Sequence, residues 1–210
     1  MDEQFAIFDM DGTLIDSMVF WKNLATEYLN SKGVREIPAK ILERIKPMTI
    51  SESATLFQGT FGLTGDIESE MNTMMDDHYR KDIPLKPGVR EYLQRLHARG
   101  TRMCVASATA EYLMDVCLTR LGVRDYFEFL LSCETVGAGK RSPIVYHTSA
   151  QRLTAMPQEI AVYEDALYAI ETAKAAGYYV VGVYDDSAAD SWQAVKEMAD
   201  EIIINWEEAL

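Results

Sequence analysis

Cysteine is scarce in this sequence: among 210 residues there are only three, Cys104, Cys117 and Cys133. No two of them have the C-x-x-C spacing that is typical of redox pairs and zinc sites. The odd number argues against a disulfide framework, which small secreted proteins build from paired cysteines. We therefore expect reduced, buried thiols in a cytoplasmic protein, with no catalytic or metal-binding role.

Basic residues are also in the minority, with 20 Lys and Arg against 33 Asp and Glu and a formal net charge of −13 at pH 7. Proteins that bind nucleic acid usually carry basic patches, so we expect no nucleic-acid partner. The deficit leaves a phosphorylated substrate open, because a few local lysines and a metal ion can reverse the field inside one cleft.

Long hydrophobic runs are missing. No apolar run approaches the ~20 residues of a transmembrane helix. The first residues also lack a basic segment followed by an apolar one, so no signal peptide is expected. The sequence predicts no membrane partner, and its length suits one domain, or one domain that carries a modest insertion. It gives no indication of the oligomeric state.

The most informative stretch lies near the start, where the apolar run Phe5–Phe8 stops at Asp9 and Asp11. Four apolar residues with two Phe and one Ile predict a buried strand, and Gly12 allows a tight turn after it. Two carboxylates at the end of a strand repel each other unless a cation or a shared proton intervenes. They can hold Mg2+, attack phosphorus or transfer a proton. An ordinary Asp-Gly turn is the simpler alternative.

Residues 17–83 read as helical throughout, with no convincing strand. Apolar residues at helical spacing follow Ser17, which can cap the first helix, and Lys32-Gly33 ends that helix. Two prolines and a glycine in residues 84–88 then mark a return to the core. We therefore predict a catalytic core of residues 1–16 and 84–210 and an inserted helical cap of residues 17–83. The other cap helices are expected near residues 38–45, from Thr49 or Ser51 to Phe61, and over residues 66–80.

After residue 88, apolar runs alternate with amphipathic segments, joined by short links. This alternation predicts a mainly parallel sheet covered on both faces by helices. The predicted fold class is α/β, with a doubly wound, Rossmann-like core sheet and an inserted helical cap domain. The expected strands are 102–107, 127–131, 160–163, 179–183 and 201–204, and the expected helices are 89–99, 110–121, 142–153, 166–176 and 187–198.

The carboxyl ends of parallel strands meet at one edge of a sheet, where open α/β proteins bind ligands. Carboxylates, a hydroxyl and an ammonium group gathered there would suit phosphoryl transfer. Each residue also has an ordinary interpretation: a helix-capping serine, a solvated lysine, or acids that favour a helix N-terminus. The residues at the predicted strand ends are Asp9, Asp11, Ser107, Glu164 and Asp165, with Lys140 in the loop after strand 127–131.

Four motifs in this order resemble the haloacid dehalogenase-like (HAD) superfamily. The first is DxDGT at residues 9–13, and the second is a serine motif around Ser107. The third is the lysine motif KPxPxxY at residues 140–146, in which Arg141 replaces the usual Pro. The fourth is the acidic motif at residues 164–177, in which Ala166 and Ala169 replace a usual Ser and Gly. The resemblance covers nearly the whole chain and points to the helical-cap branch, near the β-phosphoglucomutase-like proteins and sugar-phosphate phosphatases.

The resemblance implies roles for these residues. Asp9 would be the nucleophile that becomes a phospho-aspartate, and Asp11 would be the general acid and base. Mg2+ would be held by Asp9, the main-chain carbonyl of Asp11 and Asp165, with Glu164 directly or through water. Ser107 and Lys140 would bind the transferred phosphoryl group. Asp11 excludes the dehalogenase branch, because a leaving halide needs no proton whereas an alkoxide does. The missing Ser at position 166 puts the support of Asp165 in question.

The predicted cap gives weaker indications. The positions where mutases carry a His and an Arg align with Trp21 and Ile50 here, and residues 46–51 lack the GxxR pattern. Lys22 lies near the Schiff-base position of phosphonatases, but nothing indicates a desolvated site. Residues that could line the cleft and set substrate specificity are Trp21, Lys22, Lys46 and Thr49, together with Met18 and Met48; simple helix packing is the alternative.

The sequence therefore predicts a Mg2+-dependent HAD-like phosphatase that hydrolyses a small phosphorylated metabolite, expected to be a sugar phosphate, through a phospho-aspartate. Two alternatives stay open. One is a β-phosphoglucomutase-type phosphotransferase, and the other is a catalytically silent HAD-like binding protein. Histidine offers no further catalytic group, because His78, His97 and His147 are scattered and none lies at a predicted strand end.

Overall fold

The computed structural model describes residues 4–45, 48 and 50–209. The chain divides into two compact units, Met1–Asp16 with Pro84–Leu210 and Ser17–Ile83. The first unit contains the sheet, and the second unit consists of helices. No helix in the described part of the chain is long and apolar enough to cross a membrane.

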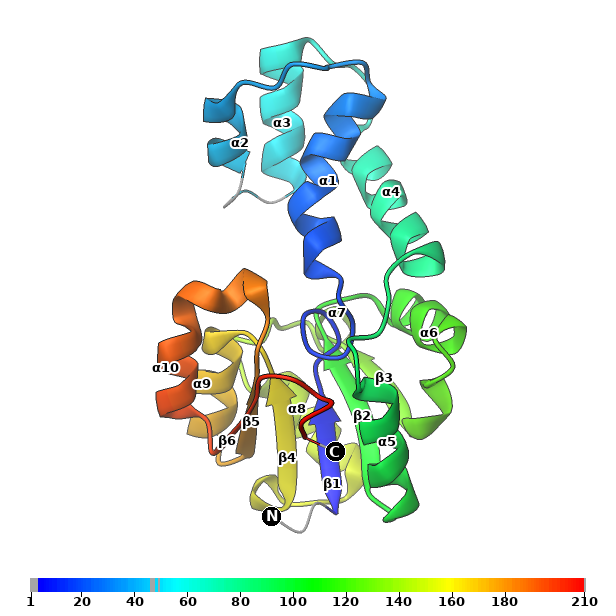
Figure 1. Ribbon diagram of the computed structural model, residues 1–210, viewed down its shortest axis with the longest axis vertical. Coiled ribbons are helices and arrows are strands. Elements are labelled where there is room, and N and C mark those ends of the chain that lie inside the picture. Colours follow the sequence, from blue (N-terminus) through cyan, green and yellow to red (C-terminus); the bar gives the residue numbers. More distant parts are fainter. Residues whose placement is uncertain (1–3, 46–47, 49, 210) are drawn as a thin grey trace. The chain divides into compact units, whose positions relative to one another are not determined.

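The first unit is built on one six-stranded sheet in the order β3-β2-β1-β4-β5-β6, with every neighbouring pair parallel (Figure 1). The chain runs outward from β1 to β3 on one side and then returns to continue from β4 on the other. The order therefore reverses between β1 and β4, which is where open α/β sheets bind ligands. The prediction of a doubly wound parallel sheet is confirmed. The strands are β1 (Phe5–Phe8), β2 (Arg102–Ser107), β3 (Phe129–Ser132), β4 (Ile160–Glu164), β5 (Tyr179–Val183) and β6 (Glu201–Ile203).

One face of the sheet packs against helices from the second half of the chain. Successive side chains of a strand point to opposite faces, so Ile7, Cys104 and Val162 share a face. They belong to one buried cluster with Tyr146 and Ile170. Most helical residues of this cluster belong to α8 (Ile144–Leu153), α9 (Leu167–Ala175) and α10 (Trp192–Met198). The three cysteines of the chain are buried and free, as predicted.

The strand side chains that point to the other face of the sheet contribute to a stack of aromatic rings. The rings of Phe8 and Tyr163 are stacked with centroids 4.3 Å apart, and Trp206 lies 5.9 Å from Tyr163. Tyr92, on α5 (Val89–Ala98), shares a 2.8 Å hydrogen bond with the hydroxyl of Tyr163. Trp206 also donates from Nε1 to the main-chain oxygen of Thr13 at 3.2 Å. The stack therefore fixes the loop that follows β1, where the candidate nucleophile lies.

Three local expectations for this unit were inaccurate. Strand β3 begins at Phe129 instead of Phe127, because a 3-10 turn at Arg124–Tyr126 precedes it and Arg124 bonds the oxygen of Phe127 at 2.8 Å. The last helix begins as 3-10 helix at Asp186–Ser191 and becomes α-helical only from Trp192. The short α7 (Cys133–Val136), which Ser132 caps, was not expected, because four residues are too few for a helical period.

The second unit contains α1 (Met18–Ser31), α2 (Ala39–Ile45), α3 (Ile50–Phe61) and α4 (Ile67–Lys81), and no strand among its described residues. Its core is formed by buried side chains of α1, α3 and α4. Ser17 precedes α1, but its side chain makes no capping hydrogen bond, so the predicted serine cap is wrong. Asp66 caps α4 by accepting from the main-chain nitrogen of Ser69 at 3.0 Å. The largest buried side chains here are Leu24, Tyr28, Leu29, Phe57 and Tyr79.

Candidate active site

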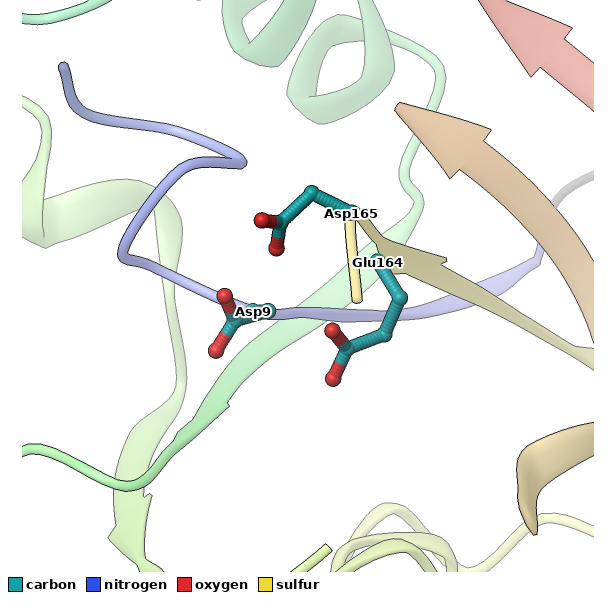
Figure 2. A group of neighbouring side chains, drawn as sticks. All are labelled: Asp9, Glu164 and Asp165. Atoms are coloured by element: carbon teal, nitrogen blue, oxygen red, sulfur yellow. The ribbon is translucent and has the colours of Figure 1, made fainter. Parts of the chain in front are cut away.

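Three carboxylates meet where the strand order reverses. Asp9 directly follows β1, and its main-chain nitrogen donates to the oxygen of Tyr163 at 2.9 Å, which holds it beside β4. Glu164 ends β4, and Asp165 follows it. Each of the three residues offers a carboxylate oxygen, and these atoms all lie within 4.8 Å of one another (Figure 2). All three residues are buried, so water screens their charges poorly.

Lys140 is the cation of this cluster. Its Nζ donates to Asp9 Oδ1 and, at 2.6 Å, to Glu164 Oε1. Lysine is rarely buried, yet Lys140 is only 6% exposed. Burial alone would lower the pKa of Lys140, but the charges of Asp9 and Glu164 outweigh burial and raise it. The ammonium group therefore stays protonated between the two carboxylates.

Tyr146 also holds the carboxylate of Glu164. Its hydroxyl, on α8, donates to Glu164 Oε1 at 2.8 Å, so Glu164 Oε1 accepts from both Lys140 and Tyr146. Tyr146 is fully buried. Sequence reasoning gave Tyr146 no role, although it is the last residue of the lysine motif and that position was the available signal.

The cluster carries more negative charge than Lys140 neutralises. Burial raises the pKa of Asp9 well above its usual value, against the lowering effect of Lys140, and the nearby acids raise it further. Burial and the charge of Glu164 raise the pKa of Asp165 to about 7. A bound cation would relieve this repulsion. The oxygen-only donor set suits a hard divalent ion, so the residues present fit a metal ion at this place.

Asp11 lies in a tight turn beside this cluster. Gly12 has φ 81°, a left-handed conformation that glycine adopts without strain, and Leu14 bonds the oxygen of Met10 at 2.9 Å. Asp11 Oδ2 accepts from Thr109 Oγ1 at 2.6 Å and from Ser107 Oγ at 3.4 Å. The structure thus joins Asp11 to Ser107. The sequence predicts that both residues lie at the same edge of the sheet. Thr109 was not identified from the sequence as a site residue. Its only signal was a hydroxyl two residues after Ser107, where β2 ends.

Thr13 supplies a hydroxyl that the acidic motif lacks. The motif usually has a Ser where this chain has Ala166, which put the support of Asp165 in question. Thr13, fully buried in the turn after β1, donates from Oγ1 to Asp165 Oδ1 at 3.2 Å. The loop after β1 therefore orients Asp165, which follows the neighbouring strand β4. Trp206 in turn anchors Thr13.

The predicted specificity residues belong to the helical unit. Trp21, on α1, is half-buried and donates from Nε1 to the hydroxyl of Tyr79 at 3.2 Å, whereas Lys22 is exposed. Met18 and Met48 are half-buried. Lys46 and Thr49 lie outside the residues that the structure describes. The structure brings Asp9, Glu164, Asp165 and Lys140 into one cluster, with Asp11 and Ser107 joined beside it.

A parallel sheet whose reversal point carries a buried acidic cluster that could hold a metal ion is typical of α/β enzymes. Residues 6–183 match the haloacid dehalogenase-like hydrolase family, and the chain belongs to that family. The family match confirms the predicted superfamily and the prediction of a hydrolase enzyme, and the named relatives below support its phosphatase class.

Known proteins resemble the chain over most of its length. The phosphorylated carbohydrates phosphatase of Thermotoga maritima is 26% identical over 190 residues, covering 87% of this chain and 88% of that protein. The fructose-1-phosphate phosphatase of Escherichia coli is 28% identical over 191 residues, covering 87% of this chain and 98% of that protein. The crystal structure of a proposed β-phosphoglucomutase from Thermotoga maritima has a TM-score of 0.82 at 23% identity, covering 98% of this chain and 95% of that one. At that identity the structural likeness concerns the fold alone.

Proposed function

We propose that this protein is a Mg2+-dependent phosphatase that hydrolyses a small phosphorylated carbohydrate through a phospho-aspartate at Asp9. The observation that carries the proposal is the buried cluster of three carboxylates and Lys140 at the reversal point of the sheet. The similarity to a phosphorylated carbohydrates phosphatase and a fructose-1-phosphate phosphatase supports the substrate class.

Asp9 acts as the nucleophile in the first half of the reaction. A carboxylate oxygen of Asp9 attacks phosphorus, the new P–O bond forms, and the bond from phosphorus to the alcohol oxygen breaks. Asp11 gives its proton to the leaving alkoxide. In the second half, water attacks the phosphorus of the aspartyl phosphate while Asp11 takes its proton. Inorganic phosphate leaves, and the Asp9 carboxylate is restored.

Lys140 and Ser107 hold the phosphoryl oxygens during both halves. The Lys140 ammonium already contacts Asp9, so it lies beside the attacking atom. Asp9, Asp165 and the main-chain carbonyl of Asp11 would hold Mg2+, with Glu164 directly or through water, and the bound ion would neutralise charge on the transferred group. Phosphoryl transfer depends mainly on such positioning and charge stabilisation.

The helical unit, residues 17–83, serves in this proposal as a cap that excludes water and selects the substrate. Trp21 and Lys22 on α1, with Lys46 and Thr49, are the residues proposed to contact the substrate. Binding of a phosphate analogue should then lower the exposure of Trp21, measured as the difference in fluorescence quenching between wild type and Trp21→Phe. Unchanged quenching would count against the cap role.

The main test measures phosphate release from a panel of sugar phosphates with and without Mg2+. Wild type is compared with Asp9→Asn and with the matched control Asp190→Asn, which makes the same charge change at an exposed position. We expect Mg2+-dependent release from wild type and from the control, and a loss of roughly a thousandfold or more in Asp9→Asn.

Other results would change the assignment. Undiminished release from Asp9→Asn would exclude Asp9 as the nucleophile. Formation of a positional isomer in place of free phosphate would indicate a phosphotransferase. Binding of the sugar phosphate without any turnover would indicate a binding protein.

A further inference from the structure

Arg141 replaces the usual proline of the lysine motif, and its side chain has an unusual setting. The guanidinium carbon lies 4.8 Å from the ring centroid of Tyr168. Arg141 is exposed, and it makes no hydrogen bond or ion pair with the described residues. Its positive charge and its five donor hydrogens are therefore available to a ligand.

Both partners of this contact adjoin the active site in the chain. Arg141 follows Lys140, whose ammonium group lies on Asp9 and Glu164. Tyr168 lies in the first turn of α9, three residues after Asp165. Burial raises the pKa of Tyr168, and the charge of Glu164 raises it further against the lowering effect of Lys140, so its hydroxyl senses the charges of the cluster. The contact thus joins the residue after Lys140 to the first turn of the helix after Asp165.

The chemistry of an arginine fits one kind of ligand group. A guanidinium presents parallel donors that match the two oxygens of a carboxylate or a phosphate. Stacking on an aromatic face restricts the side chain before binding, which lowers the entropy lost when a ligand binds. A chain with a net charge of −13 otherwise repels multiply charged anions, so a cation beside the site changes which substrates can approach.

We propose that Arg141, stacked on Tyr168, binds a second anionic group of the substrate, so that the preferred substrate is a phosphomonoester whose alcohol part carries a carboxylate or a further phosphate. The inference rests on the proposed phosphatase function and narrows its substrate class. The simpler alternative is that the Arg141–Tyr168 contact only fastens the loop that carries Lys140. If the contact only fixes this loop, it supports the turnover of every substrate equally. If Arg141 binds the substrate, it favours substrates that carry a second anionic group.

The test uses two matched pairs of esters that differ mainly in the second charge. Glycerol 3-phosphate and 3-phosphoglycerate differ by a carboxylate, and fructose 1-phosphate and fructose 1,6-bisphosphate differ by a phosphate. The readout is the ratio of kcat/KM for the charged ester to that for its uncharged partner, measured for wild type, Arg141→Gln, Arg141→Lys and Arg152→Gln. Arg152 is the matched control, because it also lies over an aromatic ring, that of Phe129 near the other end of the sheet.

We expect wild type to prefer the charged member of at least one pair. Arg141→Gln should lower that preference about tenfold, mainly through KM, as a charge-assisted hydrogen bond is lost. Arg141→Lys should keep part of the preference, and Arg152→Gln should keep all of it. An effect confined to one pair identifies the second group as a carboxylate or as a phosphate.

Equal losses for both members of a pair in Arg141→Gln would overturn the inference and favour the loop-fastening role. Unchanged kcat/KM values for both members, or a wild type that prefers the uncharged esters, would also overturn it while leaving the phosphatase proposal standing. A wild type that releases phosphate from none of the panel, although it is folded and supplied with Mg2+, would overturn the proposed function itself.

Discussion

The hydroxyl of Tyr146 donates a 2.8 Å hydrogen bond to Glu164 Oε1, inside the core beneath the candidate active site. The same oxygen accepts from Lys140, so the direction of the Lys140 ammonium depends on how Glu164 is held. A single hydroxyl on α8 therefore connects packing of the core to the position of Lys140. Tyr146 is proposed as a positioning residue, because its hydroxyl bonds Glu164 and acts through that carboxylate.

Replacing Tyr146 by Phe removes this hydroxyl and leaves the ring in place. We expect kcat for phosphate release to fall about fivefold to tenfold and the free energy of unfolding to fall by about 1 kcal/mol, the usual value of one intramolecular hydrogen bond. Steady-state kinetics and denaturant unfolding measure the two effects. The control is Tyr178→Phe, which removes a hydroxyl bonded to His147 Nδ1 at 2.9 Å. Equal loss of kcat in both variants would mean that Tyr146 has only a structural role.

Thr109 should set the orientation of the candidate general acid. Its Oγ1 donates to Asp11 Oδ2 at 2.6 Å, and its main-chain nitrogen donates to Ser107 Oγ at 3.2 Å. Thr109→Val keeps the shape and removes the donor, so we expect kcat to fall about tenfold with little change in KM. Thr109→Ser should recover most of the rate. The control Thr135→Val removes an exposed hydroxyl that bonds Glu111, and a similar loss there would contradict the prediction.

Much of this site could be predicted because its residues end apolar runs. Asp9, Ser107 and Asp165 stand where buried strands stop, and the carboxyl ends of parallel strands must meet at one edge. The supporting hydroxyls carry no such signal. Thr13 bonds a residue 152 positions away, and Tyr146 reads as one more apolar residue on the buried side of a helix. Their partners depend on the register of β1 against β4 and on the rotation of α8, which no local pattern records.

The fold shows the same division between strong and weak signals. The limits of β1, β2 and β5 follow from apolar runs bounded by polar residues or glycine, and they agree with the prediction. Strand β3 does not, because Phe127 is buried without joining the ladder and is held by Arg124. Hydrophobicity alone cannot separate a buried loop residue from the first residue of a strand.

Thr13 should contribute to metal affinity through Asp165. Its hydroxyl orients a carboxylate that we propose as a Mg2+ ligand, and loss of such support typically weakens metal binding by about 10-fold to 100-fold. Mg2+ that binds the folded protein raises the melting temperature. We expect Thr13→Val to need an about tenfold higher Mg2+ concentration for the same rise, and Thr13→Ser to need the wild-type concentration. Thermal unfolding across a Mg2+ titration measures this without reference to turnover. An unchanged titration midpoint in Thr13→Val would exclude the role.

His78 should make the stability of the helical unit depend on pH. Its ring nitrogens lie 2.8 Å from Asp82 Oδ2 and 3.0 Å from Glu27 Oε2, which links α4 to α1. Burial opposes protonation, but the bonds to Asp82 and Glu27 outweigh it, so the pKa of His78 is raised above its usual 6.5. The folded chain therefore holds this proton to higher pH than the unfolded chain does. The stabilisation is fully present below about pH 6.5 and is lost as the pH rises through the raised pKa.

The matching experiment compares wild type with His78→Gln by denaturant unfolding between pH 5.5 and 8.5. Other groups titrate in both proteins, so the difference between their free energies of unfolding isolates His78. We expect that difference to be largest at low pH and to shrink as the pH rises. His147→Gln, which removes a histidine bonded to Tyr178 in the core unit, is the control. A difference that is constant with pH, or that grows as the pH rises, would show that His78 folds as the neutral imidazole and bonds the two acids without carrying charge.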